Sequence, residues 1–106
     1  MFSITLICMG KLKEKFYTAA AEEYSKRLRA FADFRIVELP EEKIEEKNAS
    51  DAVVKKALDK EGRAILGSVR KGAAIVAMCI EGKQISSDEL AQFLADRTNS
   101  GAGDVA

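Results

Sequence analysis

Histidine and tryptophan are absent from the 106-residue chain, which has only one proline and two cysteines. Without histidine the protein has no imidazole metal ligand, no histidine-based catalytic triad and no imidazole general base for use near neutral pH. Cys8 and Cys79 are too few for a disulfide scaffold or, without histidine, for a zinc site. We therefore expect two buried free thiols, a cytoplasmic protein and no metal.

Long apolar runs and an excess charge are also absent. No apolar run approaches the roughly 18 residues that a membrane-spanning helix needs, which excludes an integral membrane protein. Lysine plus arginine and aspartate plus glutamate each number 17, so the net charge is zero and the chain as a whole makes no electrostatic case for nucleic acid. The apolar content of 47% is typical of a globular protein, and the length predicts a single domain over residues 1–106.

Short apolar runs alternate along the chain with stripes of helical period. Strands are predicted near residues 2–9, 34–39 and 73–80, and helices near residues 14–31, 51–69 and 87–98. Phe2–Met9 is apolar on both faces, as an inner parallel strand is, and Ala73–Ile80 is the most apolar run and is predicted to be a central strand. The alternation predicts a three-layer α/β domain with a mostly parallel sheet.

Several residues predict how the helices begin and which face they bury. Ser50 or Asp51 is expected to cap the second helix, and Ser86 with Glu89 forms the pattern of a capping box before the third. The first helix has apolar residues at intervals of three and four, which we expect to face the core. These residues are Tyr17, Ala20, Ala21, Tyr24, Leu28 and Phe31. Asp104–Ala106 resembles the start of a fourth strand, so we expect the chain to be cut short.

Charge is distributed in blocks. Residues 36–51 carry a net charge of −4, from six acidic and two basic side chains, and residues 52–71 carry +4, from six basic and two acidic side chains. Such blocks are typical of solvated surfaces. Glutamates in the first block could bind a cation weakly, but a solvated acidic loop is favoured. These are Glu41, Glu42, Glu45 and Glu46. A basic patch that could touch phosphate is formed by Lys11, Lys13, Lys15, Lys26, Arg27 and Arg29, although it lacks interleaved aromatic residues.

Common catalytic motifs do not occur. Gly10 stands alone after the first strand, so there is no dinucleotide-binding G-x-G-x-x-G, and no serine or threonine follows Lys11 as a phosphate loop requires. No G-x-S-x-G nucleophile motif is present. Residue patterns alone therefore predict an α/β domain without a reaction, and no catalytic residue is named.

Four segments resemble the RlmH family of methyltransferases. They are Gly10–Lys15 at the exit of the first strand, Val37–Pro40, Lys60–Leu66 and Glu81–Ala91. The resemblance covers the chain from Met1 to Ala106. It implies a small SPOUT-class enzyme that uses S-adenosylmethionine to methylate N3 of a pseudouridine in 23S rRNA on the assembled bacterial ribosome. It also implies a cytoplasmic homodimer with a trefoil-knotted cofactor site.

The resemblance assigns one site residue in this chain. Met78 corresponds to a wall of the cofactor pocket, a place that a flexible thioether suits, although Met78 could equally be an ordinary core residue. The family's other cofactor contacts, its knot and its substrate-side residues correspond to positions beyond Ala106. We therefore expect the 106-residue chain alone to be inactive. A non-catalytic α/β module that binds a protein or the ribosome surface remains the alternative.

Overall fold

The structure is a computed structural model that describes residues 3–45, 47, 49–99 and 103–106. Its elements, in chain order, are β1 (Ser3–Met9), α1 (Lys15–Leu28), β2 (Asp33–Leu39), α2 (Asp51–Gly67), α3 (Ser87–Asn99) and β3 (Asp104–Val105). Every predicted helix is present, as are the strands predicted near 2–9 and 34–39. The predicted α/β class and parallel sheet are confirmed.

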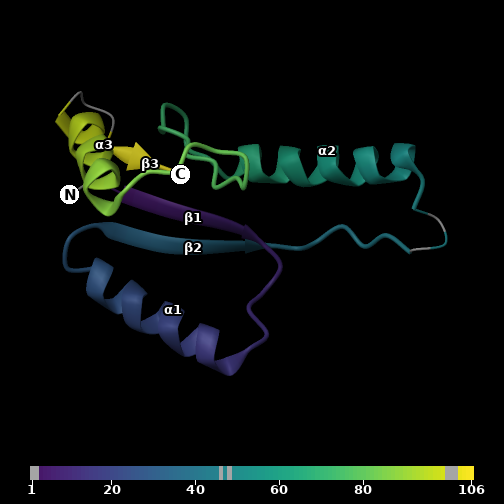
Figure 1. Ribbon diagram of the computed structural model, residues 1–106, viewed down its shortest axis with the longest axis horizontal. Coiled ribbons are helices and arrows are strands. Elements are labelled where there is room, and N and C mark those ends of the chain that lie inside the picture. Colours follow the sequence, from purple (N-terminus) through teal and green to yellow (C-terminus); the bar gives the residue numbers. More distant parts are fainter. Residues whose placement is uncertain (1–2, 46, 48, 100–102) are drawn as a thin grey trace.

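The sheet has three parallel strands in the order β2-β1-β3, with β1 in the centre. β1 pairs with β2 along its whole length, from Ser3 opposite Asp33 to Met9 opposite Leu39. Its pairing with β3 is short and covers only Ser3 and Ile4. Figure 1 shows α1 on the β2 side of the molecule, with α2 and α3 on the β3 side. The inner position predicted for the first strand is correct.

Side-chain caps begin two of the helices as predicted. The Ser50 hydroxyl oxygen accepts a hydrogen bond from the Val53 backbone N–H at 3.3 Å at the start of α2. At α3 the capping box is complete, because Ser86 Oγ accepts from the Glu89 N–H at 3.1 Å and Glu89 Oε1 accepts from the Ser86 N–H at 3.3 Å. These bonds satisfy N–H groups that have no partner within the helix.

The prediction of a central strand at 73–80 is wrong. Only Ala74 forms a β-bridge, with Val105, and the segment then continues without regular structure. The Val76 N–H donates to the Ala106 carbonyl oxygen at 2.8 Å, and the following residues as far as Ile80 have no strand beside them. The physical reason is the strand order: β3 lies beside β1, so the 73–80 segment lies outside β3 and can pair only along its few residues.

The prediction for the buried face of α1 holds for Ala21, which lines the space between helix and sheet, but it is wrong for the large residues. Tyr17, Tyr24 and Phe31 are exposed, whereas the neighbouring Ser25 is buried with 8% of its surface accessible. Helical spacing places the large residues in one row, but it does not decide which way that row points. In the structure an adjacent row with smaller side chains faces the sheet.

Few side chains are fully buried. Among the described residues only Ala32 and Val105 are buried apolar residues, and Ser25 is the one buried polar residue. The cysteines are unbridged; Cys8 is half-buried, but Cys79 is exposed, so the expectation of a buried thiol fails there. Within the described part of the chain, no helix has both the length and the apolar character needed to cross a bilayer.

The backbone conformation of Gly10 gives a testable prediction about the stability of this fold. Its φ of +82° is a left-handed conformation that costs a residue with a side chain roughly 1–2 kcal/mol, and a Cβ there would collide with the Glu41 carboxylate. We expect Gly10→Ala to lower the free energy of unfolding by about that amount or more, measured by urea denaturation. Gly62→Ala is the control: it lies within α2 with open space around it, so it should stabilise by about 0.5–1 kcal/mol. Equal effects would contradict this account.

The irregular 73–80 segment predicts self-association. Met78 is 88% exposed and Ile80 is fully exposed, and they follow an exposed Ile75. Contiguous apolar surface of this kind is uncommon on stable monomers, and unpaired backbone beside it can pair with another chain. We expect the purified chain to form dimers or larger species at high concentration by light scattering, and the double variant Met78→Lys/Ile80→Lys to form fewer. A monodisperse monomer of the unaltered chain would refute the expectation.

Candidate functional site

Two of the segments that resemble the RlmH family meet where β1 and β2 end. The Gly10 N–H donates to the Leu39 carbonyl oxygen at 2.7 Å, which extends the pairing of the two strands by one residue. The Glu41 side chain then lies directly against Gly10. The carboxyl ends of parallel strands are where ligands bind in open α/β sheets, so this edge is the first candidate site.

A third similar segment reaches the same edge through Glu42. The Glu42 backbone N–H donates to Glu61 Oε2 at 3.1 Å, and the Glu42 carboxylate pairs with Lys60 Nζ at 3.1 Å. Both partners are on α2. Sequence reasoning placed Glu42 in a solvated loop and missed this contact. The signal was the opposite charge of the blocks 36–51 and 52–71. Of the other glutamates proposed for a weak cation site, Glu46 lies outside the described residues.

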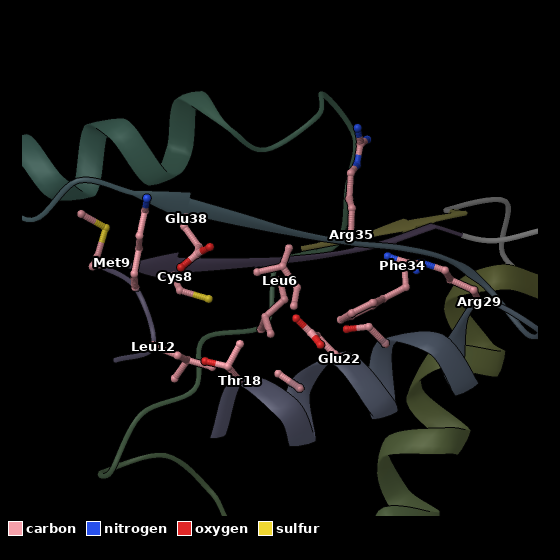
Figure 2. A pocket seen from close by; sticks show the side chains of 15 residues that line it. Leu6, Cys8, Met9, Leu12, Thr18, Glu22, Arg29, Phe34, Arg35 and Glu38 are labelled. Carbon is pink, nitrogen blue, oxygen red and sulfur yellow. The ribbon is translucent and has the colours of Figure 1, made fainter. Parts of the chain in front are cut away.

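A cavity of about 770 Å³ opens between α1 and the sheet (Figure 2). Leu6, Cys8 and Ile36 supply an apolar wall from the sheet, and Thr18 and Glu22 face it from α1. The complete lining is Leu6, Cys8, Met9, Gly10, Lys11, Leu12, Thr18, Ala21, Glu22, Ser25, Arg29, Phe34, Arg35, Ile36 and Glu38. Because Gly10 and Lys11 belong to this lining, the cavity extends to the edge where the strands end.

The predicted basic patch is divided in the structure. Lys11 and Arg29 lie at the cavity, whereas Arg27 is on the exposed surface of α1 and pairs with Glu23 at 3.0 Å. Lys13, Lys15 and Lys26 are exposed and outside the cavity lining. The patch is therefore not one continuous phosphate-binding surface, and the two cations at the cavity share it with Glu22 and Glu38.

A smaller cavity of about 330 Å³ lies between the 73–80 segment and α3. It is lined by Ile75, Val76, Ile85, Glu89, Leu90 and Phe93. α3 therefore faces this segment through Leu90 and Phe93. Leu90 is still exposed, so the contact is incomplete.

Met78, the one predicted cofactor residue, lines neither cavity and projects into solvent. The described residues around it do not enclose a space for S-adenosylmethionine, which is a ligand that pockets of this kind bury on most sides. Among the described residues, no three histidine, cysteine, aspartate or glutamate side chains come close enough together to hold a metal ion. The structure therefore brings α1 and α2 separately to the end of the β1–β2 pair. Among the described residues, Met78 is not part of this site.

Comparison with known proteins defines the class. A family model described as "Predicted SPOUT methyltransferase" matches residues 2–106, so the chain belongs to this family. The chain is similar to the "Ribosomal RNA large subunit methyltransferase H" of Streptococcus uberis (strain ATCC BAA-854 / 0140J), with 43% identity over 102 residues. The alignment covers 96% of this chain and 64% of that relative.

The exposure of Met78 predicts weak cofactor binding by the 106-residue polypeptide. With this side chain open to solvent, we expect calorimetric titration with S-adenosylmethionine to give little or no heat of binding. Met78→Ala should leave the titration unchanged. Micromolar affinity, or its loss in the variant, would show that the described residues hold the cofactor better than their arrangement indicates.

Proposed function

We propose that the protein is a ribosomal RNA methyltransferase that transfers a methyl group from S-adenosylmethionine. The observation that carries the proposal is the 43% identity to a large-subunit rRNA methyltransferase over nearly the whole chain, together with the family match over residues 2–106. The family match over residues 2–106 spans the strands of the sheet, the edge at Gly10 and the Glu42–Lys60 pair of this chain. These are the parts that determine how the domain is assembled.

The finer proposal concerns the target and the setting. The target is N3 of a pseudouridine in 23S rRNA, methylated on the assembled ribosome in the cytoplasm by a homodimer. The resemblance of Gly10–Lys15 and Glu81–Ala91 to the RlmH family supports this choice. Lys11, at the end of β1, lies beside the proposed edge and could meet an RNA phosphate there as a mobile point charge.

Met78 is proposed as a wall of the cofactor pocket in the complete enzyme. Two observations support this role. Its thioether is uncovered, so it is available to a ligand or to another part of the protein, and thioethers adapt to irregular apolar surroundings. Its segment also begins at the bridge that joins Ala74 to Val105 of β3.

Deletion of the gene that encodes this chain tests the function. We expect the N3-methylated pseudouridine to disappear from 23S rRNA, as measured by mass spectrometry of nucleosides from purified ribosomes. The intact gene supplied on a plasmid should restore the methyl group, and the gene carrying Met78→Glu should restore less of it. Persistence of the modified nucleoside in the deletion strain would reject the proposal and favour a non-catalytic binding module.

A further inference from the structure

The α1 helix exposes its large side chains and turns small ones toward the sheet. Tyr17, Tyr24 and Leu28 form one row along the helix, and all three are exposed. Ser25, one residue after Tyr24, is buried, and Thr18 and Ala21 lie beside it along the cavity. Tyr17 and Tyr24 therefore leave more than half of their surface in water, and Leu28 about a third, which is unfavourable.

The sheet beneath α1 also has apolar residues that remain exposed. Leu6 and Ile36 line the cavity of about 770 Å³ between α1 and the sheet, yet both are exposed. Figure 2 shows Glu22 reaching from α1 toward this apolar wall. Glu22 makes no ion pair or hydrogen bond with any described residue. Glu22 is itself exposed, so the sheet side of α1 presents a solvated carboxylate while the rings of Tyr17 and Tyr24 lie in solvent.

A single rotation would cover both sets of exposed residues. Successive residues of an α-helix are separated by about 100° around its axis, so Tyr24 lies about one such step from the buried Ser25. Tyr17 stands in the same relation to Thr18, and Leu28 lies near Tyr24 and Tyr17 on the helix surface. A turn of that size would direct the three large residues to the sheet and carry Glu22 away from it.

We propose that α1 has a second, closed position, reached by rotation about its own axis, in which Tyr17, Tyr24 and Leu28 fill the cavity against Leu6 and Ile36. The described structure is the open position. The connection Lys11–Glu14, which has no regular structure, gives freedom at the start of the helix, and the hydrogen-bonded turn Arg29–Ala32 has to rearrange at its end. Because Lys11 and Gly10 line the cavity, closure of α1 controls access to the edge where β1 and β2 end. The inference does not depend on the proposed function.

Two matched variants distinguish the positions. Tyr24 and Phe16 are both 64% exposed in the open position, but Phe16 lies on the outer side of α1 and stays in solvent after the rotation. We expect Tyr24→Ser to lower the equilibrium constant for folding at least about tenfold more than Phe16→Ser, since it empties the cavity. Failure of only the Tyr24 variant to fold has the same meaning. Equal losses in the two variants would overturn the proposal.

Tyrosine fluorescence gives a readout that requires no variant. Tyr17 and Tyr24 are the only tyrosines, and the chain has no tryptophan, so the signal reports on α1 alone. At a concentration where sedimentation shows a monomer, acrylamide should quench the folded chain far less than the 55% and 64% exposure of Tyr17 and Tyr24 in the open position would allow, relative to the chain unfolded in guanidinium. Quenching of half or more of the unfolded value would show that the row remains in solvent and that α1 does not close.

Discussion

The parallel pairing of β1 with β2 is the interaction on which the rest of the structure depends. Seven consecutive residue pairs join these strands, and the Gly10 N–H adds a further hydrogen bond to Leu39. β1 also pairs with β3, so it joins described residues from near both ends of the sequence. The candidate edge exists because β1 and β2 end together, which brings Gly10 beside Glu41.

α2 and the segment after it are attached by polar contacts rather than by a deep core. α2 is linked to the strand end through Lys60 and Glu42, and the segment after it is linked to β3 through Arg70 and Asp104, whose atoms are 3.5 Å apart. Exposed pairs of this kind contribute at most about 1 kcal/mol each. The periphery is therefore expected to open at much lower free energy than the β1–β2 pair.

Local chemistry could be predicted from the sequence better than long-range packing. The caps at Ser50 and Ser86 involve residues three apart, so the sequence contains all their partners. The buried face of α1 and the position of Ala73–Ile80 depend on which other elements pack against them. The periodicity of apolar residues carries no information about those packing partners. Glu42 and Lys60 are separated by 18 positions, and only their charges indicated a contact. Met78 rests on resemblance, because an apolar residue in an apolar run has no signal of its own.

The strand pairing also affects the order in which the chain folds. Ser3 pairs with Asp33 at moderate sequence distance but with Asp104 across nearly the whole chain. Contacts between residues distant in sequence slow folding, because the chain loses the entropy of closing a long loop before the hydrogen bonds of the contact form. During synthesis the β1–α1–β2 unit can therefore form while later residues are still being added. The short β3 must join last, and until it does one edge of β1 stays open to other chains.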